Sequence, residues 1–294
     1  MRISNTTHTL VSKIGLFETV RLLKDSGFDC YDLSLTTVTK ETTLLNTADN
    51  YIEFAQSLRR YADEIGISCN QVHTPYPTGK GDDMDEARFQ AQVRGLEIAS
   101  VMGAEIAVVH PIQHLNYAEH QRTLFKINVD FYKRLVPYAE TFGVKIATEN
   151  MWQTNNGSRI PSDSVCSRAW EFCEMIDTVN SPWLVGCLDI GHASLMGADI
   201  PQFIYDMGPN RLQALHIHDT DLVHDSHTLP FTLNIDYIAV ARALGEIGYR
   251  GDFTFEAPYF FTKFPTALYL PAAKLMCETG KYLAAQIESA RKPQ

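Results

Sequence analysis

Two kinds of apolar segment alternate along the chain from one end to the other. Short runs rich in β-branched residues, such as VKIATE at 144–149 and DFTFE at 252–256, have the composition of strands that are covered on both faces. Between them lie longer segments with apolar residues three and four positions apart, such as LFETVRLLKDS at 16–26, which is the spacing of amphipathic helices. This alternation predicts a parallel sheet whose strands are connected by helices.

The pattern predicts eight strands and about eight helices. The strands are expected at 2–4, 30–35, 67–72, 105–109, 144–149, 184–189, 212–216 and 252–256. Seven of the helices can be placed, at 16–26, 49–65, 85–102, 118–142, 163–178, 234–247 and 265–289, with a kink at Pro137 in the fourth. Glycines that suit the C-terminal cap of a helix precede five of the strands, at Gly27, Gly66, Gly103, Gly143 and Gly248.

Eight such units fit a single (β/α)8 TIM barrel that spans residues 1–294 as one domain, because one barrel is routinely this long. An open doubly wound α/β sheet would alternate in the same way. It has no support here, because no Gly-rich phosphate-binding fingerprint follows the first strand. No linker, low-complexity tract or block of charge divides the chain.

The composition is that of an ordinary acidic globular enzyme, with a net charge of −10. This charge argues against nucleic acid as a partner, which would need clustered Lys and Arg. The N-terminus lacks the apolar core of a secretory signal, and no run of about 18 apolar residues predicts a membrane span. The six cysteines form no CxxC pair, so we expect reduced thiols in a cytoplasmic protein.

Four of the expected strands end in a side chain of the kind that binds metals. These residues are Glu149, Asp189, His216 and Glu256, which lie 40, 27 and 40 positions apart. In a parallel barrel the C-terminal ends of all strands open on one face, so the four side chains would converge there. For a single strand-end Glu, a salt bridge explains the charge equally well, but the set of four favours a metal. Three carboxylates and one imidazole suit Mn²⁺, Mg²⁺, Co²⁺ or Zn²⁺, and the sequence does not choose among them.

Further polar residues are expected on the same face, either as substrate-binding groups or as additional metal ligands. They are His73, His110, His192, Asp225 and His227. A single His-Pro pair after a strand is usually structural, but the shared face makes all five candidates for the pocket. His218 and His224 are weaker cases. His218 has the side-chain parity of His216 but lies past the expected end of the strand, and is kept only as a further pocket candidate.

Aromatic and basic side chains near this face have two interpretations each. Trp152 lies three residues after Glu149 and could stack on the apolar face of a sugar, although loop aromatics more often pack as part of a lid. Arg159 could hold a phosphate or a carboxylate, although a solvated surface arginine is the simpler explanation.

Together these segments resemble the sugar-phosphate isomerase/epimerase superfamily of xylose isomerase-like TIM barrels, over about residues 1–285. The resemblance is carried by VHTPY at His73, VVHP at His110, TEN at Glu149, LDIGHA at Asp189, LHIHD at His216, DSHTLP at Asp225 and FEAP at Glu256. Each motif alone is weak, whereas the ordered set, one for each βα unit, is specific to the superfamily.

The resemblance implies one divalent metal held by Glu149, Asp189, His216 and Glu256, and a small sugar or polyol as the substrate. In the ketose 3-epimerases of this group two metal-bound glutamates face each other across the substrate. Glu149 and Glu256 would accordingly be catalytic: one removes the proton next to the carbonyl and the other returns a proton on the opposite face. The metal would stabilise the enediolate, and His192 would hydrogen-bond a substrate oxygen. Relatives often pair as dimers or tetramers, so a homo-oligomer is also expected.

The chain departs from the ketose epimerases at two places. Those enzymes carry a substrate-holding Arg six residues after the ligand His, where this chain has Leu222. They also carry a longer signature with Pro and Arg after the first Glu, where this chain has NMWQTN. Dehydration of an inosose, or isomerisation of another polyol or keto-sugar, therefore fits the remaining residues equally well.

The runner-up resemblance is to the zinc AP-endonuclease family, which shares this barrel and binds three zinc ions through nine residues. The chain has a candidate for each, namely His73, His110, Glu149, Asp189, His192, His216, Asp225, His227 and Glu256. Hydrolysis of a phosphodiester by a zinc cluster is thus the alternative function. The acidic charge counts against it, and so does the segment after His227, which lacks the Gly-rich turn of that family. A non-catalytic sugar-binding barrel is the third possibility.

Overall fold

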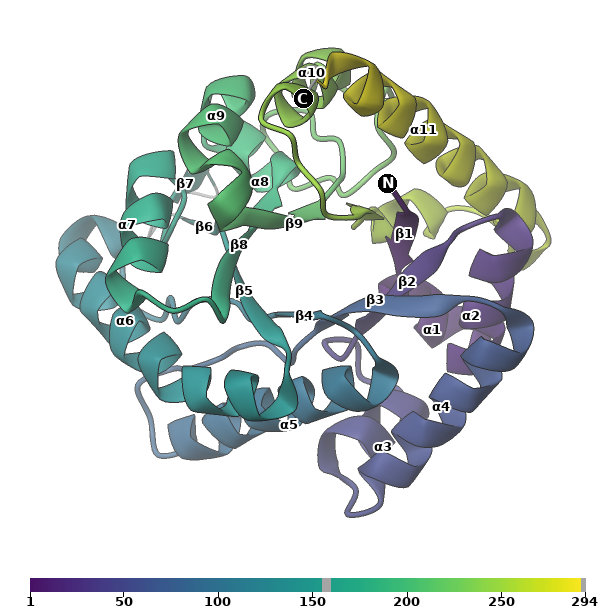
Figure 1. Cartoon of the computed structure of the whole chain (residues 1–294), viewed down its shortest axis with the longest axis horizontal. Helices are drawn as coiled ribbons and strands as arrows, with labels where there is room; N and C mark the ends of the chain where they lie inside the picture. The colour runs from purple at the N-terminus through teal and green to yellow at the C-terminus, as the bar shows by residue number, and fades with distance from the viewer. Residues whose placement is uncertain (155–159, 292–294) are drawn as a thin grey trace.

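A closed barrel of eight parallel strands forms the centre of the computed structural model, which describes residues 1–154 and 160–291 (Figure 1). The strands are β1 (Ile3–Thr6), β2 (Cys30–Ser34), β3 (Ser68–His73), β4 (Ile106–Val108), β5 (Lys145–Glu149), β8 (Leu184–Asp189), β9 (Leu212–His216) and β10 (Phe253–Phe255). They follow one another in chain order around the sheet, with β10 beside β1. Ile217 pairs with Phe255 and so joins the β9 and β10 edges. The predicted TIM barrel is therefore confirmed.

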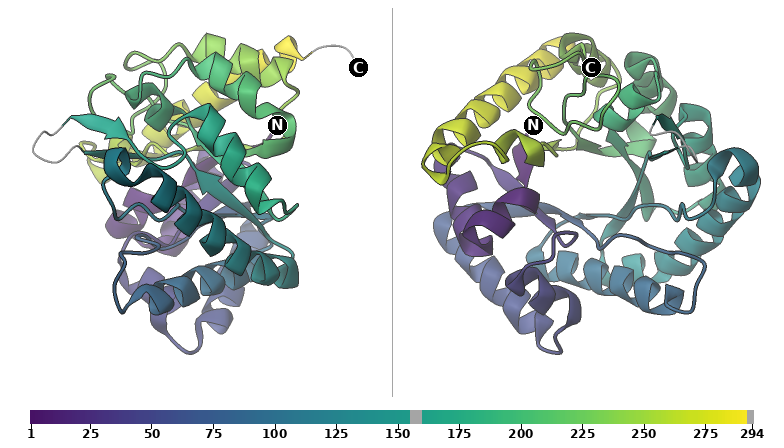
Figure 2. Two further views of the ribbon diagram at one scale, coloured as in Figure 1. Left: turned by 90° about the vertical axis from the view of Figure 1, so that its left-hand side faces the viewer. Right: turned by 180° about the vertical axis from the view of Figure 1, so that it is seen from behind.

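Helices surround the barrel on all sides, as Figure 1 shows in the view along the barrel. They are α2 (Leu16–Ser26), α4 (Tyr51–Ile65), α5 (Asp85–Met102), α6 (Tyr117–Phe142), α7 (Ala169–Val179), α9 (Ile200–Arg211), α10 (Tyr237–Glu246) and α11 (Tyr269–Ala290). Shorter elements lie in the loops: α1 (His8–Ile14), α3 (Lys40–Thr47), α8 (Ile190–Leu195), the 3₁₀ turns Pro258–Phe261 and Thr266–Leu268, and the hairpin of β6 (Trp152–Thr154) and β7 (Pro161–Asp163). The side view in Figure 2 shows the helices along the outside of the barrel and this hairpin at one end.

Several expectations about single elements are corrected. The helix expected at 163–178 begins only at Ala169, because Pro161–Asp163 pairs with β6 as a strand. α9 was not predicted, since Gly208, at φ 64°, and Pro209 interrupt its helical spacing. The kink in α6 lies at His120, where φ is −128°, and not at Pro137.

The predicted glycine caps are confirmed. Gly27, Gly66, Gly103 and Gly143 each cap a helix in the left-handed conformation, and Gly248 follows α10 with φ 72°. A left-handed residue reverses the chain at the end of the helix and directs it into the next strand.

The interior of the barrel is part apolar and part polar. Val108, Ala147, Val185, Cys187 and Ala214 form an apolar cluster inside it, separate from the larger core between strands and helices. Polar side chains from several strands share the remaining space. They include Ser4, Asp32, Asn70, Gln71 and Thr254, all of them buried.

Other expectations concern the chain as a whole. The six cysteines are free, and all except the half-buried Cys173 are buried. Among the described residues no helix is both long and apolar enough to cross a bilayer. Arg159 lies outside the described residues.

Candidate metal centre

The four strand-end residues meet at one point of the barrel. Glu149, Asp189 and His216 are the last residues of β5, β8 and β9, and Glu256 directly follows β10. One ligand atom from each of the four lies within 4.8 Å of the others. Nδ1 of His216 lies 3.2 Å from Oε2 of Glu149 and 3.4 Å from Oε2 of Glu256. All four side chains are buried.

Three buried polar atoms of this cluster lack hydrogen-bond partners. Both carboxylate oxygens of Glu149 and Nδ1 of His216 are buried without one. Burying charged groups in this way costs several kcal/mol unless they are paired or coordinated. Three carboxylates and one imidazole are also the donor set that divalent cations accept. The residues present therefore fit a divalent metal ion, and their role as its ligands is taken up below as a proposal.

Mutual electrostatics keep the two glutamates of this cluster ionised. Burial raises the pKa of Glu149, but His216 and His110 lower it more, so that it lies well below its usual range. The pKa of Glu256 is likewise raised by burial and lowered further by His216 and His73. Burial lowers the pKa of His216, whereas Cys187 and the two glutamates hold it well above its usual value. A positive charge is thus strongly favoured between the glutamates.

Two of the predicted histidines lie beside the glutamates. His73 ends β3, and its Nδ1 lies 3.3 Å from Oε1 of Glu256. His110, two residues beyond β4, has its Nε2 3.1 Å from Oε2 of Glu149. The two histidines are themselves in contact, with their Nε2 atoms 2.8 Å apart. Both imidazoles therefore lie directly beside the two glutamates.

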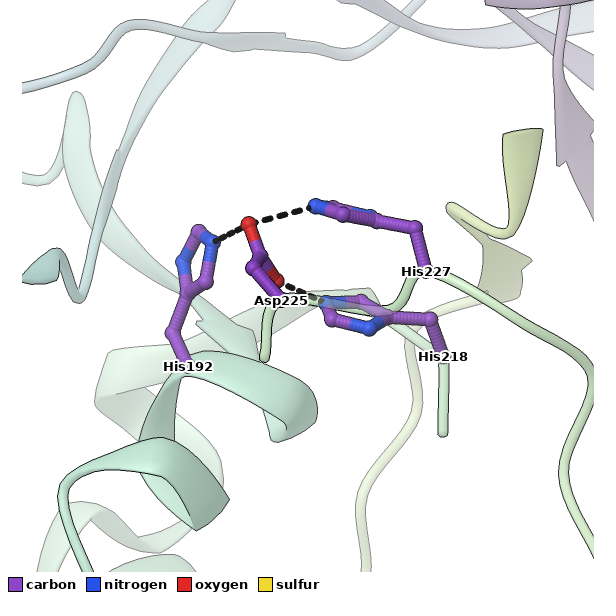
Figure 3. A group of neighbouring side chains, drawn as sticks. All are labelled: His192, His218, Asp225 and His227. Atoms are coloured by element: carbon purple, nitrogen blue, oxygen red, sulfur yellow. Dashed lines mark hydrogen bonds and ion pairs between the residues drawn. The ribbon is translucent and has the colours of Figure 1, made fainter. Parts of the chain in front are cut away.

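A second cluster gathers around Asp225, as Figure 3 shows. Nε2 of His227 lies 2.9 Å from Oδ2 of Asp225, and Nε2 of His192, on α8, lies 3.6 Å from the same oxygen. Nε2 of His218 lies 3.8 Å from Oδ1. Trp152 also contacts this cluster, because its indole N–H donates to Oδ2 of Asp225 over 3.3 Å. The predicted residues His192, Asp225, His227 and Trp152 are thus brought together, while their roles remain predictions.

His192 and His218 connect the two clusters. Nδ1 of His192 lies 3.2 Å from Oε1 of Glu149. Nε2 of His218 lies 3.0 Å and 3.1 Å from the two oxygens of Asp189. The His218 ring also stacks on that of His227, with centroids 3.8 Å apart and planes 20° apart. His218, a weaker candidate from the sequence, therefore contacts both clusters of the site.

Sequence reasoning missed three residues that touch the ligands. Asn150 brackets Asp189, since its Oδ1 accepts from the Asp189 backbone N–H and its Nδ2 donates to the Asp189 carbonyl. Its position directly after Glu149, in the motif TEN, is the sequence feature that could have identified it. Gln71 on β3 and Asp32 on β2 lie beneath His216. A bulge in β3 hid Gln71 from the strand pattern.

Two residues of the loop after β9 lie apart from the cluster. His224 is exposed and pairs with Asp221, with Nδ1 2.7 Å from Oδ2. Leu222, at the position of the epimerase arginine, is also exposed and has φ 70°.

Replacement of Gly191 by Ala is expected to displace His218. A Cβ built on Gly191 would overlap the His218 ring, which the stacked His227 confines on another side. We expect a loss of about 1–3 kcal/mol in unfolding free energy, as for other overpacked sites, and weaker metal binding because His218 leaves Asp189. Urea unfolding and metal titration check these effects. Gly143→Ala, where nothing lies within 4 Å but φ is 67°, should lower stability alone. Unchanged metal affinity in Gly191→Ala would contradict the account.

The metal-free protein is expected to lose stability as the pH rises from about 6.5 to 9. Burial lowers the pKa of His227, but the Asp225 carboxylate raises it more, to about 9. Because the folded pKa exceeds the unfolded one, the stabilisation is complete below about 6.5 and disappears as the pH passes 9, with an upper limit of about 3 kcal/mol. Urea unfolding with a chelator should show wild type and His227→Gln converging at high pH. A difference that does not change with pH would contradict this.

The fold and the cluster together define a (β/α)8 barrel with a carboxylate–imidazole centre at the C-terminal ends of its strands. The xylose isomerase-like TIM barrel family matches residues 20–276, and the chain belongs to this family. The family expected from the sequence is thereby confirmed.

Individual relatives are distant but match along most of their length. Uncharacterized protein MJ1311 of Methanocaldococcus jannaschii is 27% identical over 82% of this chain and 79% of its own. The putative L-ribulose-5-phosphate 3-epimerase SgbU of Escherichia coli is 22% identical over 81% and 82%, respectively. The crystal structure of a D-tagatose 3-epimerase-like protein superposes with a TM-score of 0.75 at 20% identity, over 98% of this chain and 100% of that one. This likeness shows the same fold.

Proposed function

We propose that the chain is a divalent-metal-dependent isomerase or epimerase that transfers a proton next to the carbonyl of a sugar, polyol or keto-sugar. One observation carries the proposal: Glu149 and Glu256, both buried and ionised, approach Nδ1 of His216 from strands that lie apart around the barrel. The names of SgbU and of the tagatose epimerase-like protein agree with this class of reaction.

Glu149, Asp189, His216 and Glu256 would hold the metal ion. A divalent cation at this point would act as a Lewis acid on the substrate carbonyl and make the neighbouring C–H more acidic. Burial in a water-poor site strengthens such an effect.

The two glutamates would carry the proton. Because they lie on two sides of the centre, one carboxylate can remove the proton from one face of the substrate carbon, and the other can return a proton to the opposite face. His192, whose Nε2 lies 3.6 Å from Oδ2 of Asp225, would hydrogen-bond a substrate hydroxyl. Loss of a neighbouring hydroxyl after the same first step would give a dehydratase instead.

Uptake of deuterium from solvent tests this function. The metal-loaded protein should exchange the hydrogen next to the carbonyl of at least one ketose or inosose in D₂O, as seen by NMR or mass spectrometry. Transfer to the opposite face would yield the epimer, and loss of water would yield the dehydrated product. A protein that binds metal and a sugar but exchanges no hydrogen in any of these substrates would instead be a binding barrel.

A multinuclear phosphodiesterase is the second candidate, and three of the five groups of potential ligands among the described residues favour it. His73, His110 and Glu149 form one group, the strand-end quartet a second, and the cluster of His192, His218, Asp225 and His227 a third. About three zinc ions for each chain, together with cleavage of DNA at an abasic site, would support it. One metal ion for each chain and no cleavage would remove it.

A further inference from the structure

The two ring nitrogens of His216 face different surroundings. Nδ1 faces the glutamates, whereas Nε2 points into the barrel interior. There the amide nitrogen Nε2 of Gln71 lies 3.1 Å from Nε2 of His216, and Oδ2 of Asp32 lies 3.9 Å from the same ring nitrogen. The proposed function uses Nδ1 only and gives Nε2 and its neighbours no role.

A bulge in β3 creates this arrangement. Tyr31 pairs with Cys69, and Asp32 pairs with Gln71, so that Asn70 is the extra residue of β3. Asn70 and Gln71 are consecutive, yet both side chains are buried and bonded inside the barrel. In a regular strand one of the two would face the helices. The bulge therefore places Gln71 directly beneath His216.

The chemistry of an imidazole ligand requires an acceptor at this place. A histidine that binds a cation through Nδ1 keeps its proton on Nε2, and a buried N–H needs an acceptor. Rotation of the Gln71 amide by 180° brings Oε1 to the position next to Nε2. No other side chain has a hydrogen bond to Nε2 of His216 among the described residues.

Asp32 adds a negative charge behind this contact. Its side chain is fully buried, and neither carboxylate oxygen has a hydrogen-bond partner. A carboxylate at 3.9 Å is too distant for a direct bond, but it favours a proton on Nε2 of His216.

We propose that Gln71 is a positioning residue of the metal centre and that Asp32 supports it electrostatically. Together they hold the proton of His216 on Nε2 and so keep Nδ1 directed at the cation. This inference rests on the metal site of the proposed function. Gln213 on β9 provides a comparison. Gln71 and Gln213 both line a cavity of about 730 Å³ at the opposite end of the barrel from the metal centre, but Gln213 accepts a hydrogen bond from Lys145.

Metal affinities of matched variants test the proposal. Metal-free wild type, Gln71→Met, Gln71→Glu and Gln213→Met are titrated with Mn²⁺ and with Zn²⁺ by calorimetry. Gln71→Met removes the acceptor and should weaken binding about 10–100-fold, as the loss of other outer-sphere partners does. Gln71→Glu keeps an acceptor and should restore most of the affinity, while Gln213→Met should bind as wild type does. Asp32→Asn removes only the charge and should fall between wild type and Gln71→Met.

The outcomes separate the proposal from a purely structural role and from the proposed function. Wild-type affinity in Gln71→Met, or equal weakness of Gln71→Met and Gln71→Glu at wild-type melting temperature, would overturn it. Wild-type affinity in Asp32→Asn would remove Asp32 from it. If wild type itself bound no metal, the proposed function would fail instead.

A measurement on the wild-type chain covers the case in which the Gln71 variants do not fold. With ¹⁵N-labelled histidine and Zn²⁺, the proposal expects a slowly exchanging proton on Nε2 of His216 in the NMR spectrum. A proton on Nδ1, or none on either nitrogen, would overturn the proposal.

Discussion

Glu256→Gln is expected to slow hydrogen exchange strongly in the substrate epimer on which Glu256 acts, while leaving the fold in place. The amide keeps the size of the side chain but cannot take up a proton at neutral pH. Loss of a positioned acid or base typically lowers a rate about 10²–10⁴-fold. The exchange rate in D₂O, measured at saturating metal, checks this. Circular dichroism would show whether the variant is folded.

A buried glutamate outside the cluster provides the control. Glu171 on α7 is buried and accepts from the backbone N–H of Cys166. Glu171→Gln should therefore exchange substrate hydrogen at the wild-type rate. Wild-type exchange in Glu256→Gln as well would rule out a catalytic role for Glu256.

The two glutamates should also differ in the substrate epimer that they serve. If each acts on one face, Glu149→Gln and Glu256→Gln should lose exchange from opposite epimers. Exchange measured separately on two epimeric ketoses tests this. Equal loss from both epimers in both variants would indicate that the substitutions act through the metal and not through the proton.

His216→Ala is expected to lose metal binding. Nδ1 of His216 lies between two carboxylates, which would repel each other without a cation. Because loss of an outer-sphere partner costs about 10–100-fold in affinity, loss of the ligand itself should cost more than about 100-fold. Titration calorimetry with Mn²⁺ or Zn²⁺ measures the effect. His224→Ala, which changes an exposed histidine paired with Asp221, is the matched control. Equal affinity in the two variants would contradict the proposed ligand set.

The barrel could be predicted because its signals are local. Buried parallel strands are short β-branched runs, and left-handed glycines mark the ends of the helices before them. β8 accordingly has the expected bounds, and so do α2 and α5. α9 was not predictable in this way, because Gly208 and Pro209 interrupt the helical spacing of its apolar residues. The three-residue strands of the β6–β7 hairpin are too short for any periodicity to appear.

The convergence of side chains was predictable where a strand ends in a polar residue. Glu149, Asp189 and His216 are the last residues of their strands, so parallel topology alone brings them together. Gln71 was not predictable, because the bulge at Asn70 shifts the alternation of β3. The contact of His218 with Asp189 depends on the space that Gly191 leaves for the His218 ring. The spacing of residues along the sequence gives no sign of this contact.

Anomalous diffraction from crystals grown with Mn²⁺ or Zn²⁺ tests the central claim most directly. The account predicts one dominant peak among Glu149, Asp189, His216 and Glu256, with ligand atoms at about 2.0–2.3 Å. No peak at this point would contradict it. Equal peaks there, beside His73 and His110, and in the Asp225 cluster would contradict a single-metal isomerase and favour the phosphodiesterase.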